Sequence, residues 1–304
     1  MNRVCFSANV KMADLLIANG KLLYLLPNFG IELGFGEKTV AQVCEEYGVP
    51  EPLFLLICNL YTFDDYTPDH AELKQVSIED VVVYLQNSHK SYLETSMPQT
   101  LEKVLSLAEL HVQPANKNML VAFCDKYRQE AIAHIKYEEE VVFSHIRMLL
   151  AGEKSNYVVS EFENSHKNID TTLKDLRSII IKYAPRTCTI AQCLPVLIDL
   201  FMLEYDLRKH TRLENFVLIP LIEYLNDGGH NGYDSSDLSE RERQTLAALA
   251  RGLSNKEIAE KLNISIHTVI SHRKNIVRKT GIKTAQGLTL YAFINNLITP
   301  KDLR

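Results

Sequence analysis

Two stretches of the sequence carry a histidine and a glutamate four residues apart, His134/Glu138 and His210/Glu214. In a helix, this spacing places both side chains on one face, one turn apart. Two other predicted helices each carry one histidine in register with their apolar residues. The candidate metal ligands are therefore His89, His134, Glu138, His166, His210 and Glu214. Burial of these groups without a common partner would cost roughly several kcal/mol, so the pattern predicts a shared metal centre.

Four imidazoles and two carboxylates suit a dinuclear centre of a first-row metal. Two carboxylates can bridge two iron ions, each iron can take two histidines, and an oxo or hydroxo bridge then leaves an open position on each. Nitrogen and oxygen donors favour iron, with manganese or zinc as alternatives. An open position accepts a small molecule such as O2, NO or peroxide. A single buried histidine is usually a hydrogen-bonded core residue, so the number and spacing of these residues carry the prediction.

Two further polar residues lie close to the candidate ligands in the sequence. Asp206 precedes His210 by one helical turn and is either a hydrogen-bond acceptor for a ligand or a carboxylate at the edge of the bundle. His145 lies about 10 Å beyond Glu138 by helical rise and is expected to be structural.

The elements that must position these residues are four long amphipathic helices. Apolar residues recur at three- and four-residue steps over residues of about 77–95, 117–149, 156–183 and 190–225. In the second of these helices, we expect the stripe to continue through Glu138 to Val141. Four such helices pack as an up-and-down bundle. Alternation typical of strands is nearly absent, so the sequence predicts an all-α protein.

The bundle is expected to occupy residues 69–226. Residues 227–237 are rich in glycine, asparagine, aspartate and serine, which predicts a linker before a C-terminal domain at 238–304. Residues 1–68 are expected to form a small cap, with short helices around 10–20, 38–48 and 51–60. The six cysteines lack C-x-x-C spacing and suggest reduced thiols of a cytoplasmic protein. No membrane helix is expected, because no stretch approaches about 18 uninterrupted apolar residues.

The C-terminal domain is basic, whereas the rest of the chain is acidic. Residues 236–304 contain 12 Lys or Arg and 6 Asp or Glu, and the remaining residues contain 21 and 32. This distribution indicates that the tail binds a polyanion. Ser239 with Glu242, and Ser254 with Glu257, are predicted to form capping boxes at the starts of two short helices.

A short turn joins the predicted helices 254–262 and 265–280, which is the arrangement of a helix-turn-helix. The second helix of such a motif enters the major groove of DNA. The candidate DNA-binding residues are His267, Thr268, Ile270, Ser271, Arg273, Lys274, Arg278 and Lys279. Cationic side chains among them would meet phosphates and base edges. The alternative is a solvated charged helix, which the basic charge, the spacing and the caps together disfavour.

Residues of about 77–225 resemble the hemerythrin-like, or HHE cation-binding, domain. The segments His134-Ile-Lys-Tyr-Glu138 and His210-Thr-Arg-Leu-Glu214 are similar to its two metal-binding helices. The similarity is greatest to the RIC (repair of iron centres) subgroup, whose di-iron site likewise uses four histidines and two glutamates. The resemblance implies a four-helix hemerythrin-like bundle that binds two iron ions.

Two departures from these families bear on function. Oxygen-carrying hemerythrins add a fifth histidine on the third helix, where this chain has Phe162 and Asp170 in the neighbouring positions. Residues 1–65 resemble the small N-terminal domain of RIC proteins, but Leu33 and Gly34 stand in place of its adjacent cysteine pair. We therefore expect redox or NO chemistry rather than O2 carriage, and a structural cap at residues 1–68.

The segments Leu238–Glu242 and Thr268–Gly281 resemble the LuxR/FixJ-type DNA-binding domain nearly throughout. The resemblance implies a four-helix domain with a helix-turn-helix and binding to double-stranded DNA. It also implies that Ile270, Ser271 and Lys274 face the bases. The last helix of such domains is often a dimer contact, so a homodimer is expected.

Together these features predict a cytoplasmic transcription regulator. A hemerythrin-like di-iron centre would sense a redox or gaseous signal, and the helix-turn-helix would bind DNA. One alternative is a di-iron protein of nitrosative or oxidative stress defence, which repairs iron centres or reduces NO and carries an accessory DNA-binding domain. A second alternative is a regulator whose metals are only structural. We assign no catalytic residue.

Overall fold

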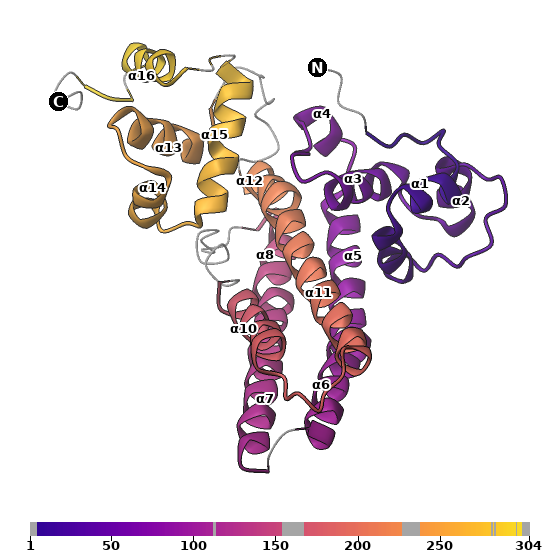
Figure 1. Cartoon of the computed structure of the whole chain (residues 1–304). Coiled ribbons are helices and arrows are strands. Elements are labelled where there is room, and N and C mark those ends of the chain that lie inside the picture. The colour runs from indigo at the N-terminus through magenta and orange to yellow at the C-terminus, as the bar shows by residue number, and fades with distance from the viewer. Residues whose placement is uncertain are drawn as a thin grey trace. The chain divides into compact units, whose positions relative to one another are not determined.

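Helices make up nearly all of the computed structural model (Figure 1), and the residues that it describes contain no strand. These residues are 5–111, 114–153, 167–226, 238–280, 282, 284–295 and 297–299. They fall into two units, one with the N-terminal region and the bundle and the other with the C-terminal helices. The prediction of an all-α protein is confirmed. None of the described helices combines the length and apolar character that a membrane span requires.

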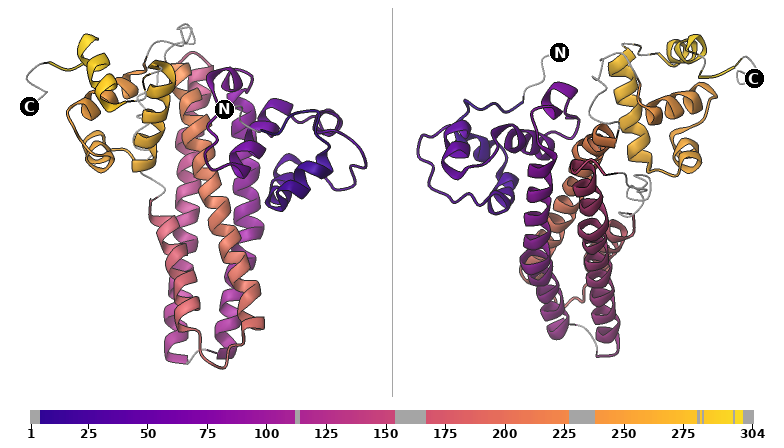
Figure 2. Two further views of the ribbon diagram at one scale, coloured as in Figure 1. Left: turned by 45° about the horizontal axis from the view of Figure 1, so that its top comes forward. Right: turned by 180° about the vertical axis from the view of Figure 1, so that it is seen from behind.

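Four long helical rods lie side by side in the bundle (Figures 1 and 2). Three of them are continuous helices that contain a π-helical turn, and the described part of the third rod in the chain is a single helix. The rods are, in chain order, α5 (Ile78–Ser91), η2 (Tyr92–Ser96) and α6 (Met97–His111); α7 (Pro114–Tyr137), η3 (Glu138–Val142) and α8 (Phe143–Leu150); α10 (Lys167–Tyr183); and α11 (Ile190–Leu213), η4 (Glu214–Leu218) and α12 (Ile219–Asn226).

The apolar stripes of these rods meet in one core. Leu101, Tyr127, Leu173 and Leu200 come from four different rods and are completely buried in the same cluster. Their burial removes apolar surface from water, which is the main favourable contribution to the packing of such helices. The stripe predicted from sequence therefore accounts for the arrangement of the bundle.

The π-helical turns shift the stripe by one residue in the second rod. Val141, which was expected to continue the stripe beyond Glu138, is 39% exposed, whereas Val142 is fully buried. A π turn contains one residue more than an α turn, so the residues after it are rotated by about 100° relative to an uninterrupted helix. The expectation for Val141 was wrong for this reason.

The N-terminal region consists of five short helices beside the bundle. These are α1 (Met12–Ala18), η1 (Gly20–Phe29), α2 (Val40–Tyr47), α3 (Glu51–Thr62) and α4 (His70–Leu73). Lys209 of α11 is fully buried and donates hydrogen bonds to the Leu60 carbonyl at 3.1 Å and the Asp64 carboxylate at 2.8 Å. Arg212 donates to the Tyr66 carbonyl at 2.8 Å. The carbonyls at and just beyond the end of α3 are thus satisfied by cations of a bundle helix.

A disulfide joins Cys188 and Cys193 at the start of α11. The expectation that all six cysteines are reduced thiols was wrong for this pair, whereas the other four are free. Thr189 is the N-cap of α11 and forms a capping box with Gln192. Cys188 and Cys193 therefore occupy the positions where an apolar pair often fixes the entry of a chain into a helix.

The C-terminal unit contains four helices, α13 (Glu240–Ala250), α14 (Asn255–Leu262), α15 (Ile266–Thr280) and α16 (Ala285–Ile294). Both predicted capping boxes are present, at Ser239/Glu242 and Ser254/Glu257. The unit has two small apolar clusters, one around Leu246 and Ile276 and one around Ile258 and Val269. The tight turn between α14 and α15 is the one expected of a helix-turn-helix.

Candidate metal centre and DNA-binding helix

Five of the six predicted metal ligands lie in the described part of the bundle, and all five are buried. His89 lies in the last turn of α5, His134 near the end of α7 and His210 near the end of α11. Glu138 and Glu214 are the first residues of the π-helical turns η3 and η4. The sixth, His166, lies outside the described residues.

Glu138 is the centre of this group. Its carboxylate oxygens lie 2.9 Å from Nε2 of His89, 2.7 Å from Nε2 of His134 and 3.7 Å from Nε2 of His210. Glu214 approaches Nε2 of His210 at 3.2 Å. The helices therefore bring together the two histidine–glutamate pairs that the sequence singled out, with His89 added from a third rod.

The donor atoms are spaced as a metal ion requires. One ligand atom each from His89, Glu138 and His210 lies within 4.8 Å of the others. Nitrogen and oxygen donors bind first-row metals at about 2.0–2.2 Å, so donors on opposite sides of an ion are about 4 Å apart. Mixed imidazole and carboxylate donors in this geometry suit iron, manganese or zinc.

Electrostatics also favour a cation in this place. Burial lowers the pKa of His210, but the charges and hydrogen bonds of Glu214 and Glu138 outweigh it and raise that pKa well above its ordinary value. Two carboxylates with at most 1% exposure have little contact with water, so their charges need a positive partner nearby. A metal ion can supply positive charge in place of a bound proton, and it binds to the same nitrogen and oxygen atoms.

The positions of the π-helical turns coincide with the positions of the candidate ligands. Each turn begins at the candidate ligand, and a third one, η2, begins three residues after His89. A single π turn inside an α-helix is rare and frequently marks a functional site. Three such turns lie at one level of the bundle. Each turn rotates the residues that follow it, so the polar candidate ligands and the apolar residues after them can both face the core.

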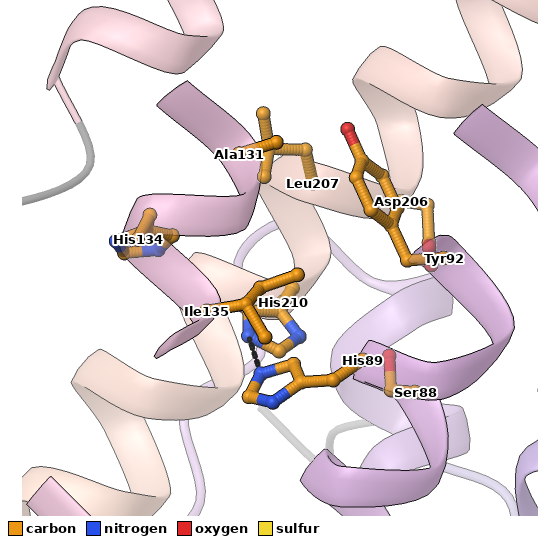
Figure 3. A pocket seen from close by; sticks show the side chains of 9 residues that line it. All are labelled: Ser88, His89, Tyr92, Ala131, His134, Ile135, Asp206, Leu207 and His210. Carbon is orange, nitrogen blue, oxygen red and sulfur yellow. Dashed lines mark hydrogen bonds between the residues drawn. The ribbon is translucent and has the colours of Figure 1, made fainter. Parts of the chain in front are cut away.

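A cavity of about 20 Å³ adjoins the candidate ligands (Figure 3). Its lining residues come from three rods and are Ser88, His89, Tyr92, Ala131, His134, Ile135, Asp206, Leu207 and His210. This is space for about one water-sized molecule. Among the described residues, the space beside the histidines therefore suits a very small ligand.

Asp206 is part of this wall and not of the bundle edge. Its carboxylate accepts a hydrogen bond from the Tyr61 hydroxyl at 3.3 Å. Burial raises the pKa of Asp206, and the nearby His210 and the Tyr61 hydrogen bond partly oppose this shift. His145, in α8, is also buried, and desolvation lowers its pKa.

The sequence analysis missed three residues near the centre. Glu139 lies 3.1 Å from Nδ1 of His89 and can accept a hydrogen bond from that nitrogen, whereas Nε2 of the same ring faces Glu138 at 2.9 Å. The hydroxyls of Tyr92 and Tyr127 are hydrogen-bonded to each other in the core. The run of three glutamates at 138–140 was a signal for Glu139, whereas the tyrosines resemble ordinary core residues in sequence.

The predicted DNA-binding residues divide into an outer and an inner group. His267, Ile270 and Lys274 are exposed on α15. Arg273 is partly exposed and donates a hydrogen bond to the Asn255 side chain at 2.6 Å. Arg278 belongs to the same helix, but its side chain lies outside the described part of the structure.

Thr268, Ser271 and Lys279 form the inner group. The Thr268 backbone amide is capped by the Ser265 hydroxyl, and the Ser271 hydroxyl donates to the backbone carbonyl of His267. Lys279 forms a buried ion pair with Glu242. All three are oriented into the domain, so the outer group of α15 carries the accessible charge.

His272 of α15 also faces inward. It is 8% exposed, and desolvation lowers its pKa to about 4, an effect that Glu242 partly opposes. His272 is therefore neutral at pH 7 and contributes packing rather than charge.

Comparison with known families identifies both parts of the chain. Residues 98–222 match the family model described as "Hemerythrin HHE cation binding domain", and residues 236–292 match "Bacterial regulatory proteins, luxR family". The chain thus joins a hemerythrin-type HHE domain, which implies cation binding, to a luxR-type DNA-binding domain. This combination pairs a domain found in DNA-binding regulators with a hemerythrin-like domain.

Curated relatives are regulators as well. The chain is 38% identical to the "Oxygen regulatory protein NreC" of Staphylococcus carnosus over 80 residues, which are 25% of this chain and 37% of that protein. It is 45% identical to the "Transcriptional regulatory protein MctR" of Rhizobium johnstonii over 65 residues, 21% of this chain and 30% of that protein. The chain thus spans about a third of the length of these relatives. No solved structure matches the chain.

Proposed function

We propose that this protein is a transcription regulator that senses O2, NO or peroxide at a di-iron centre in its bundle and responds by changing its binding to DNA. The observation that carries the proposal is the set of buried histidine and glutamate donors beside a cavity of about 20 Å³, in a chain that also has a luxR-type domain. The protein is proposed to act in the cytoplasm as a homodimer.

Six side chains would hold the two ions: His89, His134, Glu138, His166, His210 and Glu214. The central position of Glu138 between three imidazoles suits a carboxylate that bridges two metals. Bound iron would supply redox chemistry and an open position for a ligand. Glu139 would hold the tautomer of His89, and the apolar wall around Ile135 and Leu207 would exclude bulk water.

The size of the cavity supports a diatomic or similarly small ligand. Ser88, Tyr92 and Asp206 offer the polar groups of the wall that are not candidate ligands. They can orient a bound molecule or exchange a proton with it. A relative that shares a related segment is named an oxygen regulatory protein, which makes O2 one of the three ligands to test.

Few residues of the chain separate the candidate metal centre from the DNA-binding domain. Glu214 is followed by the rest of η4, by α12 and then by residue 227 onward, with the first described residue of the luxR-type domain at Leu238. A ligand that changes the packing of His210 and Glu214 would bias the end of this rod, α12, toward one of two conformations. Such a bias changes DNA binding only if the two states differ in DNA affinity.

The test is DNA binding by the full chain after anaerobic loading with iron. An operator is first selected from genomic DNA, and its affinity is then measured with and without O2, NO or peroxide. We expect one ligand to change the affinity by at least about fivefold, the lower end of usual allosteric coupling. A zinc-loaded protein, which has no redox response, should not react to O2.

Equal affinities of apo, iron-loaded and ligand-treated protein would overturn the sensor proposal. Continuous consumption of NO or peroxide in many turnovers, with unchanged DNA binding, would favour an enzyme of stress defence instead. An identical DNA response of the zinc and iron forms would mean that the metals are structural.

A further inference from the structure

The outer face of α11 carries an apolar stripe that the bundle does not use. Ile190, Leu194, Ile198 and Phe201 are between 48% and 73% exposed. Their spacing of four, four and three residues places them within about 80° of one another around the helix axis. They therefore form one continuous stripe of about 17 Å along the helix.

The stripe extends onto the neighbouring helix α10. The guanidinium group of Arg177 lies 4.8 Å from the centre of the Phe201 ring. Ile181 follows Arg177 by one turn on the same face and is 56% exposed. We call the surface of Ile181, Ile190, Leu194, Ile198 and Phe201 the α10/α11 face.

The same part of α11 is almost free of charge. The twelve residues from Ile190 to Phe201 include one charged side chain, Asp199, which is paired with Lys103 at 2.5 Å. The twelve residues Asp125–Lys136 of α7 contain five Lys, Arg, Asp or Glu. Exposed helix faces normally carry such charges for solubility, so their absence here marks a surface that is covered.

The amount of apolar surface is that of a dimer contact. The five residues expose on the order of 500 Å², near the upper end of the largest apolar patch on a typical monomer. A standard interface buries about 800 Å² on each partner, and homodimer interfaces are about 65% apolar. Such an interface needs about 520 Å² of apolar surface per copy, which the α10/α11 face supplies.

The rim of this face suits a second copy as well. Arg177 forms an ion pair with Glu204, and Lys103 forms one with Asp199. The charges within each of these two border pairs cancel, so the pairs do not oppose the approach of an identical face. Helices related by a twofold axis can pack such stripes against each other, because each residue of one copy then meets the same surface on the other.

We propose that two copies of this chain associate through the α10/α11 face. The proposal rests on the homodimer of the proposed function and names its surface, but it does not depend on the metal. The dimer would place two luxR-type domains in one particle, as recognition of two DNA half-sites requires.

The test is sedimentation equilibrium of the full chain at several concentrations up to about 10 µM, which gives the dissociation constant of the dimer. We expect wild type to have twice the mass of the 34.7 kDa chain. Leu194→Glu and Ile198→Glu should each raise the dimer dissociation constant by at least 100-fold. Both sites are exposed, so far-UV circular dichroism should match wild type, which shows that the variants fold.

Ile17→Glu, at a site that is 81% exposed on α1, is the matched control and should remain dimeric. A dimer dissociation constant that is unchanged from wild type in both α11 variants would overturn the surface but not the dimer, and a rise caused by Leu290→Glu instead would move the contact to α16. A wild-type chain that is monomeric would overturn both. A ligand response in DNA binding by that monomer would leave the sensor proposal intact.

Discussion

A substitution of Lys279 tests which basic side chains of the luxR-type domain stabilise its fold and which bind DNA. The Nζ atom of Lys279 lies 2.6 Å from a carboxylate oxygen of Glu242, and the two side chains are 7% and 4% exposed. Glu242 also accepts the backbone N–H of Ser239 at 2.8 Å. The perturbation is Lys279→Met, which keeps much of the volume and removes the charge.

The expected loss follows from the burial of the remaining carboxylate. Removal of one partner of a buried ion pair costs about 3–5 kcal/mol. Because Glu242 keeps the hydrogen bond from Ser239, we expect about 3 kcal/mol, which lowers the Tm of a unit of this size by roughly 10–20 °C. The double variant Lys279→Met/Glu242→Gln should recover more than half of this loss, because no unpaired charge is then buried.

The assay combines unfolding with DNA binding. The chain contains no tryptophan, so unfolding of the domain is followed by circular dichroism. DNA affinity is measured against salt concentration at a temperature where every variant is folded. Lys279→Met should leave the salt dependence unchanged, whereas Lys274→Met, at an exposed site on the same helix, should reduce the slope of log K against log salt by about 1.

The opposite pattern would refute the reasoning. If Lys279→Met changes the stability by less than about 0.5 kcal/mol and lowers the salt slope as much as Lys274→Met does, Lys279 contacts DNA and the buried pair does not persist in solution.

Three other predictions follow from single features of the structure. The pKa of His272 is about 4 in the folded domain and 6.5 in the unfolded chain, so the unfolded state takes up a proton first as the pH falls. The free energy of unfolding of the domain should therefore fall by on the order of 3 kcal/mol between pH 6.5 and 4. His272→Leu should abolish this pH dependence in unfolding measurements. Val142→Ala should destabilise the bundle by about 2 kcal/mol and Val141→Ala by less than about 0.5 kcal/mol in denaturant titrations, and equal effects would argue against the π turn. Alkylation of unfolded protein without reductant should label four cysteines and with reductant six, whereas six labels in both cases would disprove the Cys188–Cys193 bond.

Features that depend on neighbouring residues in the chain could be predicted from sequence. The capping boxes at Ser239 and Ser254 form between residues three positions apart, so local chemistry determines them. The spacing of His134 and Glu138 placed both on one helical face, and the structure brings them within 2.7 Å. The all-α fold followed from the same periodicity.

Features that depend on residues far apart in the chain, or on an extra residue in a helical turn, could not be predicted from sequence. The π turn at Glu138 adds a residue that an amphipathic pattern does not reveal, so Val141 was misplaced. Lys209 looks like a surface residue in sequence, and only the end of α3, about 145 residues away, explains its burial. Lys279 is a comparable case, because its partner Glu242 lies on another helix.

The most direct test of the central claim is the iron content of the full chain after anaerobic loading and removal of unbound metal. Wild type should retain about two iron ions per chain, as the six proposed ligands require. Glu138→Gln should lose most of the iron while it keeps the helical content, and His111→Asn, at a partly exposed site away from the cavity, should retain it. A folded wild-type chain without iron, or a Glu138→Gln variant with the same iron content as wild type, would contradict the account.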